Sequence, residues 1–236
     1  MGRDVAGDRL LDLLERHGVD RRYVQVDQGL PTGRSTIRTS GFENDFIVHG
    51  PAAWDAIEGP ADLPRHDVLV YGTLAARGAV SRATLTRLLE GSAAPHKVLD
   101  VNLRPPDVQR EVLELTLGAA TAVKLGEHEL REVASLLDTP AGPEALFERF
   151  GGLVSICITR GEKGAALLER SGGSWESPAS QTDAVNTVGA GDAFTAGMAQ
   201  GLVEGLAPPE VLGLAQRTAA SILGRKGGLP ARAESG

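Results

Sequence analysis

The residues best suited to chemistry lie in a run from Asn186 to Met198, which reads Asn-Thr-Val-Gly-Ala-Gly-Asp-Ala-Phe-Thr-Ala-Gly-Met. Gly189, Ala190 and Gly191 carry no bulky side chains, and the residues after them are predicted to form the first turns of a helix. Backbone N–H groups at such a turn, together with the positive end of the helix dipole, can bind an anion. Small side chains suit this role because a phosphate group must approach the main chain closely.

Asp192 makes this run different from a simple phosphate cradle, because a carboxylate repels a phosphate anion. Its presence is explained if it accepts a proton from a hydroxyl group that attacks a phosphoryl group. The structural alternative is an acidic helix cap after a tight Gly-Ala-Gly turn. The run is neither a Walker loop nor a dinucleotide fingerprint, because Phe194 stands where the third glycine of the fingerprint would fall.

The elements that must position this run alternate between strands and helices from about residue 60 onward. Apolar runs predict strands at 67–71, 97–101, 121–125 and 154–159. Amphipathic spacing predicts helices at 81–89, with Ser81 as the cap, and at 108–117 and 127–137. A hairpin is expected from 165–170 and 175–177, followed by helices that start near Asp192 and at Pro208, the second ending near Leu223. The alternation predicts an α/β fold with a mostly parallel central sheet and helices on both faces.

The first fifty residues have a different pattern. A helix is predicted over 8–17, ended by Gly18. Three short alternating runs at 23–27, 35–39 and 46–49, separated by turn residues, predict a small antiparallel sheet. We therefore expect one α/β domain over residues 1–236 that contains a small β segment at 23–50.

Composition excludes several classes of function. The chain has 236 residues, 42% hydrophobic and 23% charged, with a net charge of −7, so a nucleic-acid partner is not expected. The single cysteine, Cys157, lies in an apolar run and is predicted to be a core residue in a cytoplasmic protein. No apolar stretch is long enough to cross a membrane. The five histidines lack metal-ligand spacing, which disfavours a metal hydrolase, and the late glycine motif disfavours a dinucleotide oxidoreductase.

The run at 186–199 resembles the second signature of the ribokinase-like (PfkB) carbohydrate kinases, Asp-Thr-x-Gly-Ala-Gly-Asp followed by a helix of small residues, with Asn186 an accepted variant of the first position. Further segments that resemble family elements follow in the family's order, at 71–74, 100–105, 124–129, 159–164 and 225–228. The resemblance covers nearly the whole chain from about Gly7. It implies a ribokinase-like fold and an ATP-dependent kinase. The Asp-x-Asn-x-Arg form of residues 100–104 is common among fructokinase-like members.

The resemblance also implies roles for individual residues. Asp192 would be the catalytic base, and the N–H groups of Gly189 to Gly191 would hold the moving phosphoryl group. Asn102 and Arg104 would lie near the acceptor and the γ-phosphate, or else cap a loop. Glu129 would hold the Mg²⁺–phosphate network through water, or else be a solvated helix residue.

The implied nucleotide and cation site is spread over several segments. Its residues are Thr159, Gly161, Gly164, Lys124, Asn186 and Gly227. Thr159 and the two glycines near it have an alternative as plain turn residues. Carbonyl groups near Asn186 and at 226–228 could bind K⁺. The strands within 23–50 match the family's lid, which covers the sugar and often pairs two subunits.

Three departures from the family pattern accompany this resemblance. Gly126 stands where Asn is usual, which removes a side chain from the metal and phosphate network. Asn186 replaces the commoner Asp and removes a charge from the cation site. Family members normally begin with a strand that bears a sugar-binding Asp and with a Gly-Gly-x-x-x-Asn segment, and this chain starts after both. It is expected to be either a clipped form of a normal kinase or a natural remnant, with part of the acceptor pocket missing.

Two functions follow from these observations. The first is a kinase that phosphorylates a primary hydroxyl of a sugar, with fructose or a related hexose or keto-sugar favoured over ribose, ketodeoxy-sugar acids and nucleosides. The second is a non-catalytic nucleotide-binding protein, which the absent opening segment and Gly126 favour. Retention of Asp192 favours the first, because binding of phosphate alone does not require that carboxylate. A rise in activity after Gly126→Asn would support the kinase, whereas a lack of ADP formation under any condition would support the binder.

Overall fold

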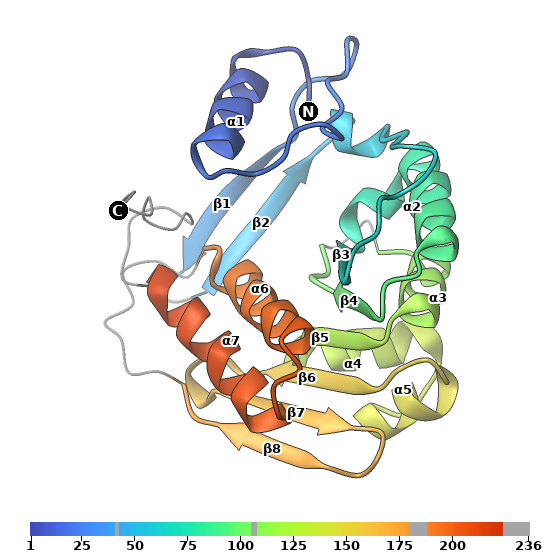
Figure 1. Cartoon of the computed structure of the whole chain (residues 1–236), viewed down its shortest axis with the longest axis vertical. Helices are drawn as coiled ribbons and strands as arrows, with labels where there is room; N and C mark the ends of the chain where they lie inside the picture. The colour runs from blue at the N-terminus through green and yellow to red at the C-terminus, as the bar shows by residue number, and fades with distance from the viewer. Residues whose placement is uncertain (41–42, 105–107, 180–187, 224–236) are drawn as a thin grey trace. The chain divides into compact units, whose positions relative to one another are not determined.

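The computed structural model describes residues 1–40, 43–104, 108–179 and 188–223 (Figure 1). The described chain forms two compact units. In the described ranges, the first unit comprises Met1–Leu63 and Ala75–Gly91, and the second comprises Pro64–Leu74 and the residues from Ser92 to Leu223. The prediction that they act as a single domain stays a prediction, and each unit is described by itself.

The second unit is built on a six-stranded sheet in the order β3-β4-β5-β6-β7-β8 (Figure 1). Its strands are β3 (Val68–Gly72), β4 (His96–Asp100), β5 (Ala122–Gly126), β6 (Ser155–Thr159), β7 (Ala165–Glu169) and β8 (Ser174–Ser177). Strands β3 to β6 are parallel, and β7 and β8 add antiparallel at one edge. The predicted mostly parallel sheet with a terminal hairpin is therefore confirmed, and the strand ends lie within a few residues of the predicted ones.

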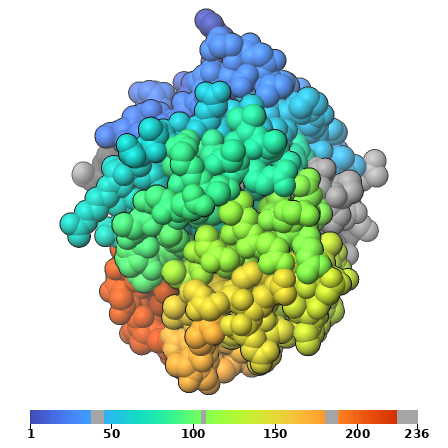
Figure 2. Space-filling model, turned by 90° about the vertical axis from the view of Figure 1, so that its right-hand side faces the viewer, coloured from blue at the N-terminus to red at the C-terminus, as the bar shows by residue number. Residues whose placement is uncertain are grey.

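Helices cover both faces of this sheet. They are α3 (Arg110–Ala119), α4 (Glu127–Leu137), α5 (Pro143–Arg149), α6 (Ala190–Val203) and α7 (Pro208–Leu223). Helices α6 and α7 pack against each other and against β3, β4, β7 and β8, whereas α3 and α4 contact β4, β5 and β6. The surface of α3 to α5 faces the viewer in Figure 2, in yellow-green and yellow. Both faces of a parallel sheet are thus covered, as its nearly continuous apolar strands require.

The alternation of side chains along each strand decides which residues meet α6. Val98, Ala122 and Cys157 belong to one apolar cluster with residues of α6 and α7. Because side chains two positions apart share a face of a strand, Asp100 and Lys124 lie on this same face, and the β4–β5 register pairs them directly. The sheet therefore places two charged side chains at the end of an apolar layer, under the start of α6.

The first unit contains α1 (Val5–Arg16), the antiparallel pair β1 (Arg34–Ser40) and β2 (Glu43–His49), a short helix η1 (Ala53–Asp55) and α2 (Ala79–Gly91). Asp4 caps α1, because its side chain accepts a hydrogen bond from the N–H of Gly7 at 2.8 Å. Gly18, at φ +68°, follows the helix end as predicted. Strands β1 and β2 form the two-stranded sheet of the segment predicted at 23–50.

Two local predictions were wrong, and one helix was missed. Residues 23–27 do not form a strand, because their chain is held by separate contacts: Gln25 accepts a bond from the amino group of Met1, and Asp27 forms one isolated bridge with Gly2. Ser81 lies inside α2 and does not cap it, since its hydroxyl donates to the carbonyl of Trp54. The seven-residue helix α5 was not predicted.

Two further expectations concern single features. Cys157 is buried in the sheet, and burial raises the pKa of its thiol to about 12, so it is a core residue as predicted. Within the described ranges, no helix is both long enough and apolar enough to cross a membrane. The predicted α/β fold class is confirmed.

Candidate active site

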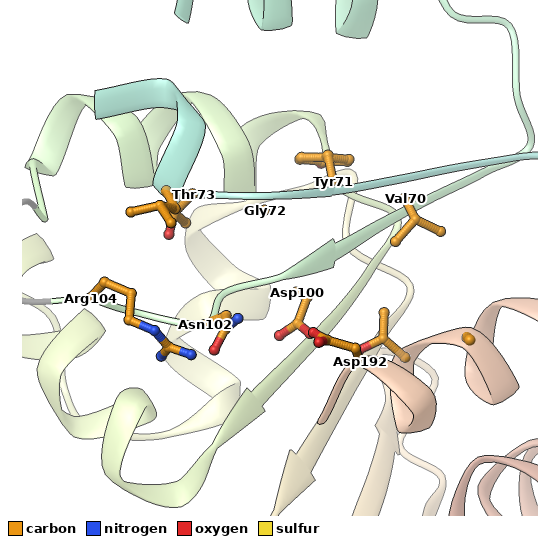
Figure 3. A pocket seen from close by; sticks show the side chains of 11 residues that line it. Val70, Tyr71, Gly72, Thr73, Asp100, Asn102, Arg104 and Asp192 are labelled. Atoms are coloured by element: carbon orange, nitrogen blue, oxygen red, sulfur yellow. The ribbon is translucent and has the colours of Figure 1, made fainter. Parts of the chain in front are cut away.

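A pocket of about 450 Å³ opens in the second unit, where β3 and β4 end and α6 begins (Figure 3). Its lining residues come from these three places: Val70, Tyr71, Gly72, Thr73, Leu74, Asp100, Asn102, Arg104, Asp192, Thr195 and Ala196. Because the carboxyl ends of parallel strands meet at one edge, segments far apart in sequence supply side chains to one cavity. Three of the predicted site residues, Asp192, Asn102 and Arg104, are brought together here.

The glycine run forms the start of α6, as predicted. Gly189 is the N-cap, and its φ of +83° is a left-handed conformation that glycine adopts without strain. The first hydrogen bond of the helix joins the N–H of Ala193 to the carbonyl of Gly189 at 2.9 Å. The N–H groups of the preceding helical residues have no acceptor within a helix, and they are therefore available to an anion.

Asp192 lies in the first turn of α6, at the wall of the pocket. Its side chain is exposed, but the surrounding walls still remove part of its water. This partial burial is the main reason that its pKa is raised, and the nearby charge of Asp100 raises it further, against the opposing effect of Lys124 and Arg104. A carboxylate with a raised pKa is a better proton acceptor, which suits a general base.

A buried polar cluster that the sequence analysis did not identify lies beneath the first turn of α6. Lys124 Nζ lies 3.0 Å from Asp100 Oδ1, and the hydroxyl of Thr195 donates to Asp100 Oδ2 at 2.8 Å. The exposed fractions are 8% for Asp100, 6% for Lys124 and 3% for Thr195. Opposite charges at the ends of neighbouring predicted strands were the signal that could have indicated this pairing. Lys124, predicted to bind the nucleotide, is engaged with Asp100.

Glu129 joins two chain segments next to the pocket. Its two carboxylate oxygens accept hydrogen bonds from the N–H of Leu103 at 2.7 Å and from the N–H of Gly126 at 2.6 Å. Leu103 lies between Asn102 and Arg104, so this carboxylate fixes the segment that carries both of them. Glu129 is half-buried and is therefore not a solvated helix residue.

Asn102 has a φ of +39°, which is uncommon for a residue other than glycine and is one of the conformations that cluster at functional sites. Asn tolerates this conformation better than most residues. Gly126 has an ordinary φ of −78°, and an added Cβ would lie 3.4 Å from Glu129 Oε2. The Gly126→Asn change is therefore compatible with the backbone.

The predicted nucleotide segment is the tight connection between β6 and β7. Thr159 ends β6 and is in register with Gly126 of β5. Gly161 and Gly164 have φ values of +57° and +89°, and a Cβ on Gly164 would lie 2.0 Å from the carbonyl oxygen of Ser177. The turn alone therefore requires glycine at 164 and favours it at 161, and the role of both residues in nucleotide binding stays a prediction. Asn186 and Gly227, together with the K⁺ site, lie outside the described residues.

The comparisons agree with this geometry. The family model "pfkB family carbohydrate kinase" matches residues 1–233. A fructokinase from Klebsiella pneumoniae is 30% identical over 226 residues, which covers 91% of this chain and 73% of that protein. The chain spans 65% of the aminoimidazole riboside kinase of Salmonella typhimurium, with 29% identity over 84% of this chain.

Solved structures share the fold. A nucleoside kinase from Burkholderia thailandensis in complex with inosine superimposes with a TM-score of 0.82 at 21% identity, over 97% of this chain and 74% of that one. The aminoimidazole riboside kinase from Salmonella enterica, complexed with aminoimidazole riboside and an ATP analogue, gives 0.79 at 23% identity, over 97% and 79%. The predicted ribokinase-like fold is confirmed, and the chain belongs to the pfkB family of carbohydrate kinases, which are phosphotransferases.

Proposed function

We propose that this protein transfers the γ-phosphoryl group of ATP to a primary hydroxyl of a sugar, with fructose or a related hexose or keto-sugar as the acceptor. The observation that carries the proposal is the position of Asp192. It stands in the first turn of α6, beside the N–H groups of the glycine run and inside the pocket. A proton acceptor next to an anion cradle is the arrangement that phosphoryl transfer to an alcohol requires.

Different residues of the site have separate roles in the proposed reaction. Asp192 accepts the proton of the sugar hydroxyl as the oxygen attacks the γ-phosphorus. The N–H groups at Gly189 to Gly191 face the negative charge that develops on the phosphoryl oxygens. Arg104 supplies a positive charge at the pocket wall, and Asn102 an amide that can bond a sugar hydroxyl.

Mg²⁺ would enter with ATP. Among the described residues, no cluster of three or more His, Cys, Asp or Glu side chains could hold a metal ion by itself. This fits Mg²⁺, which commonly keeps several waters and is held by phosphates with one or two carboxylates. Glu129 is the carboxylate suited to hold it through water, because backbone N–H groups fix its position and each oxygen keeps a second lone pair that could accept a bond from a water. When bound, Mg²⁺ would neutralise part of the phosphate charge.

The acceptor is inferred from two observations. The pocket combines apolar side chains at Val70 and Leu74 with polar groups at Thr73 and Asn102, a mixture that suits a sugar ring and its hydroxyls. The Asp-x-Asn-x-Arg-Pro form of residues 100–105 favours a fructose-like hexose, as does the Klebsiella fructokinase among the relatives.

The proposal also includes the setting in which the enzyme works. A single buried cysteine suits the reducing cytoplasm. The pair β1–β2 would be the lid and allows a homodimer through it. Ile37 and Ile47 are 41% and 38% exposed and lie on opposite faces of the pair, so each face offers one exposed apolar side chain to a sugar or to a second subunit.

The test is sugar-dependent release of ADP by the purified chain, measured with fructose, ribose, ketodeoxygluconate and adenosine as acceptors. We expect the highest kcat/KM with fructose or a related keto-sugar, and loss of that turnover in Asp192→Ala. Each reaction is run beside one without acceptor, which measures ATP hydrolysis alone. ATP binding without ADP release for any acceptor would contradict the proposal and favour the non-catalytic binder.

A further inference from the structure

The buried cluster beneath α6 connects the central sheet to the turn that carries Asp192. Asp100 ends β4, Lys124 lies opposite it in the register of β5, and Thr195 lies one helical turn after Gly191 in α6. All three residues are more than nine-tenths buried, and the Asp100 side chain by itself is 12% exposed. A buried charge is stable only when it is paired and hydrogen-bonded, and the Asp100–Lys124 pair fulfils both conditions.

The contacts of Thr195 show how the cluster reaches the first turn of the helix. Its hydroxyl lies 2.8 Å from Asp100 Oδ2 and 3.0 Å from the carbonyl oxygen of Gly191. The hydroxyl has a single proton, and the shorter bond to a charged acceptor is the stronger one. Asp100 thus anchors the helix from below.

Lys124 supports the same turn from the other side. A Cβ added to Gly191 would lie 3.2 Å from Lys124 Nζ, so the ammonium group lies directly under the backbone of the glycine run. Both oxygens of Asp100 are occupied, one by Lys124 and one by Thr195. Asp100 is therefore held within the cluster by both its oxygens, and the role of the base is assigned to Asp192.

We propose that Asp100 is a positioning residue for phosphoryl transfer, which fixes the first turn of α6 through Thr195 and places a second negative charge beside Asp192. The inference rests on the proposed function and deepens it, because it assigns a role to a residue that does not touch the reacting atoms. Figure 3 shows the Asp100 and Asp192 side chains next to each other at the pocket.

Charged groups around Asp192 have opposite effects on its pKa, and these effects can be tested separately. The charged groups that act on it are Asp100 from β4, Lys124 from β5 and Arg104 from the segment after β4. Strand β3 and the residues after it contribute Val70, Tyr71, Gly72, Thr73 and Leu74 to the pocket. Tyr71 is the one titratable side chain among these five, and burial raises its pKa above the ordinary value, so none of the five titrates near neutral pH. The charge of Asp100 raises the pKa of Asp192, and the charge of Lys124 lowers it.

The charge arm of the test is a titration of the Asp192 carboxyl carbon by ¹³C NMR, with its signal assigned from the spectrum of Asp192→Asn. Asp100→Asn should move the midpoint to lower pH, and Lys124→Met should move it to higher pH. A general loosening of the fold cannot give shifts in opposite directions. This measurement needs no substrate, so it decides the charge effect even if no sugar is phosphorylated. Midpoints that stay in place, or that move in the same direction, would overturn the inference.

The hydrogen-bond arm uses Thr195→Val with Thr195→Ser as its matched control. Valine keeps the shape but removes the bond to Asp100, so we expect kcat to fall by roughly 10- to 100-fold, with a much smaller change in the KM for ATP. Serine should restore most of kcat. In Thr195→Val and Thr195→Ser, the acidic limb of the kcat–pH profile should stay at the wild-type pH. In Asp100→Asn, the acidic limb should move to lower pH, as the NMR midpoint does.

Unchanged kcat in Thr195→Val, or failure of serine to restore it in a folded protein, would contradict the anchoring role. If Asp100→Asn does not fold, Lys124→Met and the Thr195 pair still decide the two effects. If the wild type turns over no acceptor, the proposed function fails. The anchoring role is then read from protection of the α6 amides against hydrogen exchange, which should drop in Thr195→Val, return in Thr195→Ser, and stay unchanged if the role is wrong.

Discussion

The two compact units of this protein are stabilised in different ways. The second unit has a deep apolar core, in which Leu99, Leu113, Leu125 and Ile156 are fully buried. In the described part of the first unit, the buried apolar residues are three alanines and one leucine: Ala52, Ala53, Ala76 and Leu89. Alanine buries little surface, so the hydrophobic contribution to the stability of the first unit is small.

Polar contacts take the place of apolar packing in the first unit. Asp4 accepts hydrogen bonds from the N–H and the hydroxyl of Thr32, each at 2.8 Å. Arg77 forms a two-pronged ion pair with Asp55, at 2.7 and 3.1 Å, with only 12% and 15% of these side chains exposed. Such contacts depend on pH and on single side chains, whereas an apolar core does not.

This difference places the proposed catalytic residues in the unit with the larger apolar core. All the described residues that line the pocket belong to the second unit, where an apolar layer surrounds Asp100 and Lys124. A catalytic group on a rigid element keeps its geometry, and the proposed lid, β1–β2, belongs to the unit with the thinner core. The two tryptophans allow each unit to be followed separately, because Trp54 lies in the first unit and Trp175 in the second.

The largest effect is expected at Asp192. Replacement by asparagine should lower turnover by roughly 10²- to 10⁴-fold, because the proton acceptor is lost. The same change should leave the second unit as stable as before or more stable at neutral pH, since it removes a partly buried charge beside Asp100. Urea unfolding followed by Trp175 fluorescence, in a Trp54→Phe background, measures the stability. A large loss of both turnover and stability would mean that Asp192 is a structural residue.

The next effect tests the apolar core of the second unit. Leu212 of α7 is 2% exposed, so Leu212→Ala should lower the free energy of unfolding by about 3 kcal/mol through lost burial and a residual cavity. Val203, 42% exposed at the end of α6, is the matched control, and Val203→Ala should change it by less than about 0.5 kcal/mol. If Trp54 and Trp175 report the same loss, the two units unfold together and the comparison between them fails.

A smaller effect tests the ion pair of the first unit. Arg77→Met removes both hydrogen bonds to Asp55 and leaves that carboxylate without its cation. We expect a loss of about 2 kcal/mol, measured by urea unfolding with Trp54 fluorescence in a Trp175→Phe background. Arg16→Met, at an exposed arginine of α1, is the control. Equal and small effects of both changes would show that the ion pair contributes little to the stability of the first unit.

The smallest effect is a pH dependence. Hydrogen bonds from the N–H of Thr32 and then from that of Gly7 lower the pKa of Asp4 to about 2, from an ordinary value of 3.8. Stability from these bonds is therefore present above pH 3.8 and is lost as the pH falls through about 2. Asp4→Asn should be less stable than the wild type at pH 6, and the difference should shrink below about pH 4. A stability difference between Asp4→Asn and the wild type that does not change with pH would contradict this expectation. Asp12→Asn, at an exposed residue of α1, serves as the control.

Much of the fold was predictable because its signals are local. The bounds of α4 and α7 match the predicted ones, since both helices have clear apolar spacing and distinct ends. Helix α5 was not predicted, because its seven residues bury only Leu146 and therefore show no apolar periodicity. Residues 23–27 alternate like a strand, but among the described residues their sheet pairing is limited to the single bridge between Asp27 and Gly2.

The site was predictable to the extent that it lies in one continuous run. Asp192 and the glycines before it are adjacent in sequence, and the structure places them at a helix start, where Asp192 lines a pocket. The pairing of Asp100 with Lys124 depends on the register between two strands, and the bond to Thr195 spans 95 residues. The opposite charges at the two strand ends were the one signal for the pairing, and the bond to Thr195, which is set by tertiary packing, could not be predicted from spacing.

The central claim is that Asp192 takes the proton while the phosphoryl group moves. The most direct measurement is a single turnover, in which enzyme saturated with γ-labelled ATP is mixed with the preferred sugar and the labelled sugar phosphate is followed in time. Wild type should transfer the label at least about a hundredfold faster than Asp192→Asn, with equal amounts of ATP bound to both. Equal rates of transfer in the two proteins would contradict the account.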